Sequence, residues 1–253
     1  MWHPKPSPNL FIKNKKKLFW ASESSIVGGR VAKPHSRPYM ASLQVEERHI
    51  CGGILIRPDF VLTAAHCNKL SFIITVVLGA HNISKKEKSQ QRIQVAKYIP
   101  HPKFEGHHYD IMLLKLKNNA TLNKYVRTIG LSKKEGKIPA HVNCAVAGWG
   151  KTAYDGQDPS EVLKEAVEKT QFDFECKRIW QKYFNSTHMV CTKFDKKKGG
   201  ICQGDSGGPL ICNSKPQGIT AFLYKDDCSK PNFPHVFTKI NFFLPWIKTM
   251  MQG

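Results

Sequence analysis

The chain has 253 residues, of which 41% are hydrophobic, and it carries a formal net charge of +20. A chain of this length and composition can bury a sizeable core, which excludes disorder throughout. Because no apolar run approaches the ~18 residues that a membrane-spanning helix needs, we expect a soluble protein without a transmembrane segment.

Residues 1–25 differ in pattern from the rest of the chain. They combine prolines with a lysine cluster and contain no continuous apolar stretch, so they make a poor signal peptide. We expect residues 1–25 to be an N-terminal extension or pro-segment outside the core, and residues 26–253 to form the folded part. Either the natural start lies in another exon or the extension is an unstructured tail, and the cysteines favour the first.

From residue 39 onward, short alternating or apolar runs predict β-strands. The runs are YMASLQV at 39–45, FVLTAA at 60–65, IMLLKL at 111–116 and CAVAGWG at 144–150. Turn-forming residues lie between them, with 18 glycines and 15 prolines in the whole chain. This pattern favours an all-β sandwich or barrel.

The cysteine count points to an oxidising compartment. Eight cysteines form an even set that suits disulfides, and no close C-x-x-C pair indicates zinc. The eleven histidines show no H-E-x-x-H spacing either, so we expect no metal and no cofactor. Sequons at Asn82, Asn119 and Asn185 are compatible with glycosylation and secretion.

Lysine clusters at residues 85–88, 133–134 and 196–198 carry part of the positive charge. Residues 1–25 hold only five of the 39 basic residues, so the excess belongs to the folded part. Each cluster alone is typical of a solvated loop, whereas together they support binding of a polyanion such as a glycosaminoglycan. No groove with interleaved aromatic residues accompanies them, so we expect no specific nucleic-acid partner.

The segment ICQGDSGGPL at 201–210 places Asp205 and Ser206 among glycines, which permit unusual backbone shapes. A nucleophilic Ser206 needs a base, an acid that orients the base, and N–H donors for the oxyanion. His66 in LTAAHC and Asp110 at the head of the apolar run DIMLLKL supply a base and an acid. A buried carboxylate there needs a partner, such as an imidazole N–H.

Six segments in this order resemble the chymotrypsin-family, or trypsin-like, serine proteases. They are IVGG at 26–29, CGG at 51–53, LTAAHC, DIMLL, AGWG at 147–150 and GDSGGP at 204–209. The resemblance covers residues 26–253 and is greatest to the granzyme and mast-cell protease branch. It implies a chymotrypsin-like all-β fold of two six-stranded antiparallel β-barrels, with a C-terminal helix at about 243–251.

The same resemblance implies the catalytic roles. His66 is expected to be the general base and then the general acid, Asp110 its orienting group, and Ser206 the nucleophile. The backbone N–H groups of Gly204 and Ser206 are expected to form the oxyanion hole.

It also implies activation of a zymogen by cleavage before Ile26. The new amino group is expected to pair with Asp205, because a buried carboxylate needs a charged partner. The preceding residue is Ser25 and not Arg or Lys, which argues against a trypsin-like activator and favours a dipeptidyl peptidase.

The resemblance assigns all eight cysteines to four bridges. The expected pairs are Cys51 with Cys67, Cys144 with Cys212, Cys176 with Cys191, and Cys202 with Cys228. The last bridge is absent from many granzymes and mast-cell proteases.

The expected substrate pocket departs from the family pattern. Its base is Gly200, so no carboxylate is available there for a basic substrate residue. One wall reads Ala221, Phe222, Leu223 where the family usually has Ser-Trp-Gly, so a hydroxyl is missing and a glycine is replaced by leucine. On the opposite wall His235 replaces a second customary glycine. Either His235 favours an acidic residue before the cleaved bond, or the narrowed pocket admits small aliphatic residues; both are favoured over aromatic ones.

The leading hypothesis is therefore a secreted or granule-stored serine endopeptidase. Its expected partners are protein and peptide substrates and protein protease inhibitors, and we expect a monomer. The alternative is a cationic polyanion-binding or antimicrobial protein on the same fold, with weak or no proteolysis. The serine, histidine and aspartate favour the enzyme, whereas the charge and the altered pocket favour the alternative.

Overall fold

The structure is a computed structural model that describes residues 26, 28–68, 72–132, 138–153, 158–195, 199–224 and 228–252. The expected extension, residues 1–25, and the lysine clusters at 133–134 and 196–198 lie outside the described residues. In the part of the chain that the structure describes, no helix is long and apolar enough to cross a membrane.

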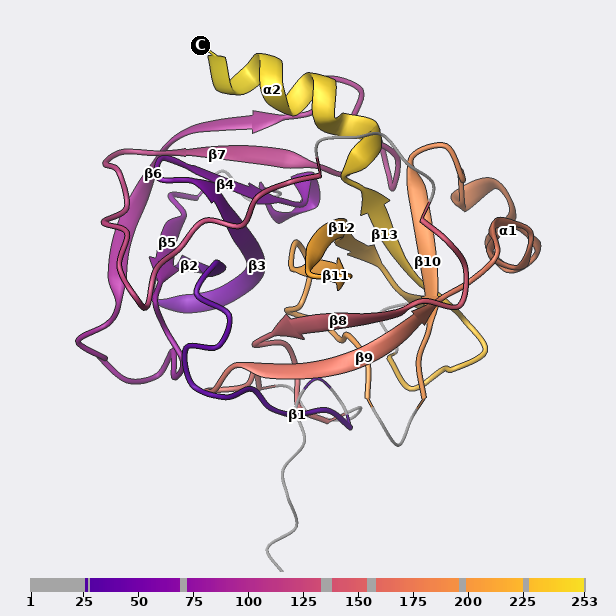
Figure 1. The fold of residues 1–253 in the computed structure, drawn as a ribbon, viewed down its shortest axis with the longest axis horizontal. Coiled ribbons are helices and arrows are strands. Elements are labelled where there is room, and N and C mark those ends of the chain that lie inside the picture. Colours follow the sequence, from indigo (N-terminus) through magenta and orange to yellow (C-terminus); the bar gives the residue numbers. More distant parts are fainter. Residues whose placement is uncertain are drawn as a thin grey trace, which may run out of the picture.

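Six antiparallel strands of the N-terminal half close into a barrel in the order β2-β3-β4-β7-β6-β5 (Figure 1). The strands are β2 (Met40–Val45), β3 (Arg48–Arg57), β4 (Phe60–Thr63), β5 (Thr75–Leu78), β6 (Gln91–Pro100) and β7 (Met112–Leu116). The two residues that connect β2 to β3, Glu46 and Glu47, have φ angles of 48° and 65°. Two positive φ angles match the twist of a tight hairpin, which sets the register of Val45 opposite Arg48.

The C-terminal half forms the second barrel. Its strands are β8 (Asn143–Gly148), β9 (Lys164–Thr170), β10 (Met189–Lys193), β11 (Pro209–Cys212), β12 (Lys215–Phe222) and β13 (His235–Lys239). They follow the order β9-β10-β13-β12-β11-β8, and β8 pairs again with β9 to close the ring. The short strand β1 (Arg30–Val31) adds to β9 from outside. The expectation of two six-stranded antiparallel barrels is confirmed.

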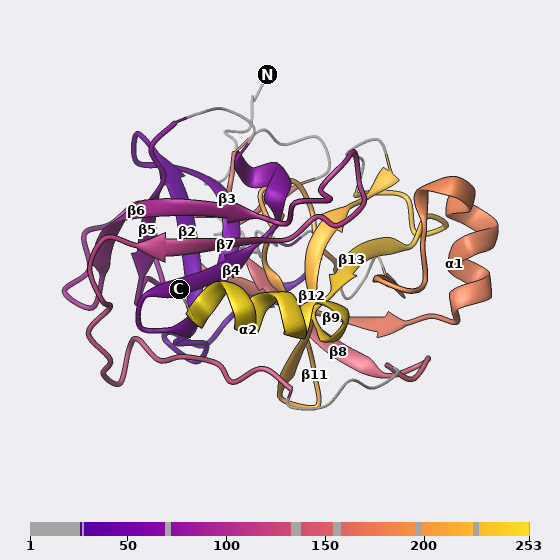
Figure 2. The same cartoon turned by 90° about the horizontal axis from the view of Figure 1, so that it is seen from above.

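Two short α-helices lie in the described part of the chain. Helix α1 (Asp173–Trp180) is followed by the 3₁₀ turn η2 (Gln181–Tyr183), and α2 (Leu244–Gln252) follows η4 (Asn241–Phe243). The C-terminal helix thus extends close to the expected range. Its Leu244 and Ile247 are buried in the same apolar cluster as the core of the first barrel, although the helix follows the second. Figures 1 and 2 show α2 crossing from the end of β13 onto the first barrel, where it ties the halves together.

Candidate active site

His66 and Asp110 come from two loops of the first barrel. His66 lies on the 3₁₀ turn η1 (Ala65–Asn68) directly after β4, and Asp110 precedes β7, the neighbour of β4. Asp110 Oδ2 accepts a hydrogen bond from His66 Nδ1 at 2.6 Å, and Oδ1 accepts one from the His66 backbone N–H at 2.9 Å. Both oxygens of the buried carboxylate thus accept hydrogen bonds from the histidine, and this pairing leaves the imidazole Nε2 available.

The segment before Asp110 is held in an unusual conformation. Tyr109 has a φ of 54°, a left-handed value that costs a non-glycine residue free energy. Its ring stacks on both His101 and His188, with ring centroids 5.1 and 4.6 Å away. The Asp110 carbonyl also accepts a hydrogen bond from Thr238 Oγ1 of the second barrel at 2.9 Å. These contacts fix the carboxylate relative to both barrels.

Ser206 reaches the site from the second barrel. It lines a cavity of about 480 Å³ together with His66 and the Cys51–Cys67 disulfide. The other lining residues are mostly apolar: Val45, Glu46, Arg48, Ile50, Asn68, Phe72 and Ile74. Among the hydrogen bonds of the described residues, none joins the Ser206 hydroxyl to His66. Such bonds are often long without substrate and tighten when substrate binds.

The loop that carries Ser206 exposes two backbone donors. Gly204 has a φ of 95°, and a Cβ there would lie 2.9 Å from the Gly150 Cα, so only glycine fits. Within the described parts of the chain, the backbone N–H groups of Gly204 and Ser206 have no protein acceptor. The N–H of Asp205, between them, donates to the Cys202 carbonyl at 3.0 Å. Two neighbouring free donors can bind an oxyanion.

His49, on β3, fixes this loop from the first barrel, a role that the sequence analysis did not find. Its Nε2 lies 2.9 Å from the Gly204 carbonyl oxygen, and its Nδ1 lies 2.8 Å from Ser42 Oγ. Gln44 Nε2 donates to the same hydroxyl at 3.2 Å. Burial lowers the pKa of His49 to about 4, so at neutral pH the neutral ring donates through Nε2 and accepts through Nδ1.

Asp205 is a buried acid on the loop that carries Ser206. Its carboxylate accepts the N–H groups of Gly150 at 2.8 Å and Cys202 at 2.9 Å. Burial raises the pKa of Asp205 to about 7, although the two hydrogen bonds favour the ionised form and act in the opposite direction. The nearby charge of Glu168 also acts to raise this pKa. Ile26 is fully buried in the apolar cluster of the second barrel that includes Ile201.

The residues expected to form the substrate pocket lie in different surroundings. Phe222 packs edge-on against Trp180 with ring centroids 5.1 Å apart, and Leu223 packs on the Cys202–Cys228 bridge. His235 is buried, and its Nδ1 lies 2.9 Å from Glu168 Oε1. Ala221, on β12, is also buried, so it adds little volume to a wall.

Glu168 is a second residue that the sequence analysis did not identify. The inward positions of β9 alternate as Lys164, Ala166, Glu168 and Thr170, and all four are buried. The strand periodicity was therefore the signal that could have found a buried acid. Its partners come from other strands and were not visible in the sequence.

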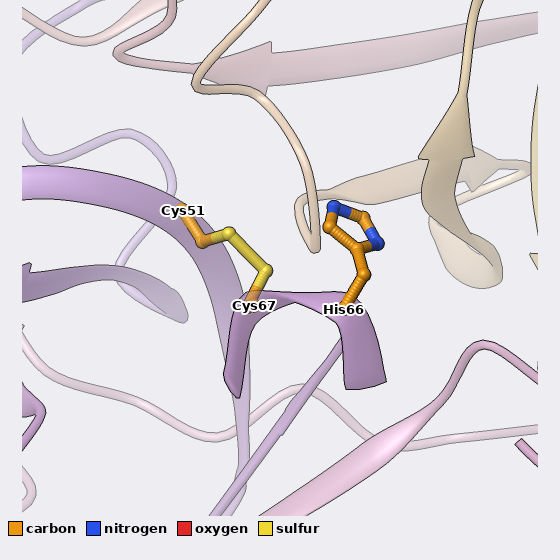
Figure 3. Close-up of side chains that lie close together, drawn as sticks. All are labelled: Cys51, His66 and Cys67. Carbon is orange, nitrogen blue, oxygen red and sulfur yellow. A yellow bond between two sulfur atoms is a disulfide. The ribbon is translucent and has the colours of Figure 1, made fainter. Parts of the chain in front are cut away.

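All eight cysteines pair in the structure. The disulfides are Cys51–Cys67, Cys144–Cys212, Cys176–Cys191 and Cys202–Cys228. Each contributes roughly 2–4 kcal/mol, largely by restricting the unfolded chain. Cys51–Cys67 lines the cavity beside His66 (Figure 3), and Cys202 of the Cys202–Cys228 bridge lies four residues before Ser206 in the chain.

One group of residues in the described ranges has the spacing of a metal site. Side-chain atoms of Cys51, His66 and Cys67 lie within 4.8 Å of one another. Figure 3 shows that both sulfurs belong to the disulfide. Because metal binding by cysteine needs a thiolate, this group offers only the imidazole.

The three sequons differ in exposure. Asn119 and Asn185 are exposed, whereas Asn82 is 9% exposed and its Oδ1 accepts the Ser84 N–H at 2.8 Å. Because a glycan needs a surface asparagine, the structure favours the first two over Asn82 as acceptors. Of the lysine clusters, only residues 85–88 are described, and Lys85, Lys86 and Lys88 are exposed there.

Comparison with known proteins gives consistent matches over the folded part. The family model described as trypsin matches residues 26–247. Mouse granzyme B(G,H) is 44% identical over 233 residues, which are 90% of this chain and 92% of that protein. Human granzyme B is 42% identical over 237 residues, covering 92% of this chain and 93% of its own length.

Among solved structures, neuropsin, a serine protease expressed in the limbic system of mouse brain, superposes with a TM-score of 0.80. It is 38% identical, and the match covers 88% of this chain and 98% of that one.

Proposed function

This chain belongs to the trypsin family of serine proteases, and from that membership we propose that it is an endopeptidase that cleaves peptide bonds through an acyl-enzyme. One observation carries the proposal. His66, oriented by Asp110, lines the same cavity as Ser206. Within the described residues, the backbone N–H groups of Ser206 and of Gly204, two residues before it, have no protein acceptor. Base, nucleophile and oxyanion donors thus come together.

The reaction follows from these groups. His66 Nε2 takes the hydroxyl proton of Ser206 while Oγ forms a bond to the substrate carbonyl carbon. The N–H groups of Gly204 and Ser206 bind the resulting oxyanion, and the positive imidazole is stabilised by Asp110. His66 then gives its proton to the leaving amine as the carbon–nitrogen bond breaks. Water, activated in the same way, releases the acid product and restores Ser206.

Activation of the enzyme by cleavage before Ile26 is part of the proposal. Asp205 is 1% exposed, and among the described residues its carboxylate accepts hydrogen bonds from the backbone N–H groups of Gly150 and Cys202 and from no charged group. A new α-amino group at Ile26 would supply the missing charge and hold the loop of Gly204 and Ser206 in its binding shape. Because Ser25 precedes the cut, we assign this step to a dipeptidyl peptidase that trims a short pro-segment.

The pocket for the substrate residue before the cleaved bond is assigned to Gly200, Ala221, Phe222, Leu223 and His235. Position 200 itself carries no carboxylate, contrary to a pocket built for basic residues. The Glu168 carboxylate that lies against Gly200 already accepts three hydrogen bonds, so a basic substrate residue is not favoured. Bulky side chains on both walls reduce the volume, because close-packed interiors leave no spare space. We propose a preference for small or acidic over aromatic residues at this position.

The cellular setting is proposed from the disulfides and the granzyme similarity. Four disulfides require an oxidising compartment, so we place the protein in the secretory pathway, secreted or stored in granules. Proteins and peptides are its substrates, protein protease inhibitors its regulators, and the monomer its working form. Asn119 and Asn185 are the proposed glycan acceptors.

The test is labelling with a fluorophosphonate probe, which reacts only with an activated serine. The protein is prepared with Ile26 as its first residue, and the labelled peptide is identified by mass spectrometry. We expect labelling at Ser206, its loss in Ser206→Ala and His66→Ala, and no change in Ser36→Ala, which removes an exposed hydroxyl. A correctly processed parent protein that stays unlabelled contradicts the proposal.

A second function is favoured by the net charge of +20. A cationic protein of this fold with weak or no proteolysis would bind polyanions such as glycosaminoglycans through exposed lysines, including Lys85, Lys86 and Lys88. Strong, salt-sensitive retention on heparin by an unlabelled protein would select this function. Labelling at Ser206 would make polyanion binding an accessory to the enzyme.

A further inference from the structure

Glu168 occupies a position where a charged side chain is costly. It points inward from β9, its side chain has no exposed surface, and the whole residue is 1% exposed. Three groups donate to its carboxylate: the Ile201 N–H at 2.9 Å, His235 Nδ1 at 2.9 Å, and Thr192 Oγ1. Both carboxylate oxygens are therefore satisfied, as a buried charge requires.

The Glu168 carboxylate and the His235 imidazole form a buried pair. Burial alone would raise the pKa of Glu168, but the charge of His235 and the three hydrogen bonds hold that pKa below its ordinary value. Glu168 is thus ionised in the folded protein. An ionised carboxylate inside a barrel needs a compensating charge, and His235 is the histidine in contact with it. A proton held by the imidazole is therefore matched by the carboxylate in direct contact with it.

Packing also fixes the His235 ring. It stacks on Phe194 with ring centroids 4.3 Å apart and an interplanar angle of 9°. With Nδ1 held by Glu168 and one face covered by Phe194, the ring has no freedom to turn. Its position is therefore decided by two residues that do not contact Ser206.

The pair lies directly against Gly200, the proposed base of the substrate pocket. A Cβ at Gly200 would lie 2.9 Å from His235 Cε1 and 3.0 Å from Glu168 Oε1, so there is no room even for a methyl group. A long substrate side chain that reached this base would meet the imidazole edge. The base of the pocket is thus closed by an acid and an imidazole that are hydrogen-bonded to each other.

We propose that Glu168 is a specificity-determining positioning residue, which holds His235 across the pocket base and cancels its charge, so that the enzyme cleaves after small uncharged residues. This inference rests on the proposed endopeptidase function and narrows it. Of the two preferences left open for the pocket, it selects small residues and excludes acidic ones, because the cation that would bind an acidic side chain is already paired.

The experiment uses the processed enzyme with Ile26 first and fluorogenic peptides that differ only in the residue before the cleaved bond. That residue is alanine, valine, leucine, phenylalanine, aspartate, glutamate, lysine or arginine. We expect the highest kcat/KM with alanine or valine, and values at least ~100-fold lower with acidic or basic residues, because their charges would be buried without a partner. Efficient cleavage after aspartate or glutamate by the parent enzyme overturns the inference.

Two substitutions separate positioning from simple packing. In Glu168→Gln the imidazole loses its counter-charge, so cleavage after acidic residues should improve at least ~10-fold. In His235→Gly the carboxylate of Glu168 faces the opened base, so cleavage after lysine or arginine should improve by a similar factor. If Glu168 only filled space, His235→Gly would improve cleavage after leucine and phenylalanine but not after lysine or arginine.

Controls keep the outcomes distinct. Glu161→Gln removes an exposed acid from the same segment and should leave the profile unchanged. The fluorophosphonate labelling rate shows whether each variant has folded into a competent site, and if Glu168→Gln fails to label, the profile of His235→Gly decides. An unlabelled parent refutes the proposed function, whereas a labelled parent whose profile does not change in either variant refutes only this inference.

Discussion

The buried acid Asp205 gives a testable dependence of stability on pH before activation. Burial raises its pKa to about 7 in the folded, uncleaved chain, against 3.8 for the ordinary side chain. The unfolded chain therefore releases this proton first, and the folded state loses stability as pH rises from about 4 to about 7. At ~1.4 kcal/mol per pKa unit, a shift of roughly three units corresponds to about 4 kcal/mol.

The assay is urea unfolding of the uncleaved protein between pH 4 and 8, in a Ser206→Ala background that prevents self-cleavage. Burial lowers the pKa of His49 and His188 to about 4, which gives an opposite slope over part of this range. The informative quantity is therefore the difference in unfolding free energy between the parent and Asp205→Asn. We expect this difference to fall by about 4 kcal/mol from pH 4 to above pH 7.

A matched control and the processed protein sharpen the result. Hydrogen bonds from Arg57 and Lys115 hold the pKa of Asp59 at about 2 despite its partial burial. The difference in unfolding free energy between the parent and Asp59→Asn should therefore not change from pH 5 to 8. With Ile26 as the first residue, the α-ammonium should remove the slope due to Asp205. If the difference in unfolding free energy between the uncleaved parent and Asp205→Asn does not change with pH, the raised pKa of Asp205 and its role in activation are both refuted.

Three substitutions test the catalytic geometry. Asp110→Asn keeps an acceptor for the His66 backbone N–H but loses the one for Nδ1, so kcat should fall by about 10⁴ with an unchanged unfolding curve. Gly204→Ala forces a Cβ at a φ of 95° against Gly150, which should misplace an oxyanion donor and lower kcat about 10²–10³-fold in steady-state assays. His49→Ala removes the donor to the Gly204 carbonyl, so the labelling rate of Ser206 should fall about threefold to tenfold; an unchanged rate would mean that the loop holds its shape without His49.

Much of the fold followed from local pattern. Short alternating runs separated by glycine and proline indicate strands, because side-chain direction along a strand repeats every two residues. The observed β2 and β7 lie within the predicted runs at 39–45 and 111–116. The number of strands in each barrel came from the ordered family segments, since strand closure involves contacts between residues far apart in the chain.

Local sequence pattern also identified part of the site. His66, Asp110 and Ser206 each stand in a distinctive segment, and the carboxylate before a buried strand signalled a need for a partner. Their proximity was an expectation from the resemblance. The structure brings His66 and Asp110 into hydrogen-bond contact and places Ser206 in the same cavity.

The substrate pocket shows what only the tertiary structure decided. The sequence indicated that position 235 carries a bulky ring but left its direction and charge open. The ring is held by Glu168, 67 residues away in the chain, and by Phe194 on a segment between strands. A side-chain rotamer and the charge of a buried pair depend on neighbours that β-sheet register brings together, and these do not follow from the residues on either side. Local pattern therefore predicts the strands and the candidate reactive residues, whereas long-range packing decides which side chains meet and which charges cancel.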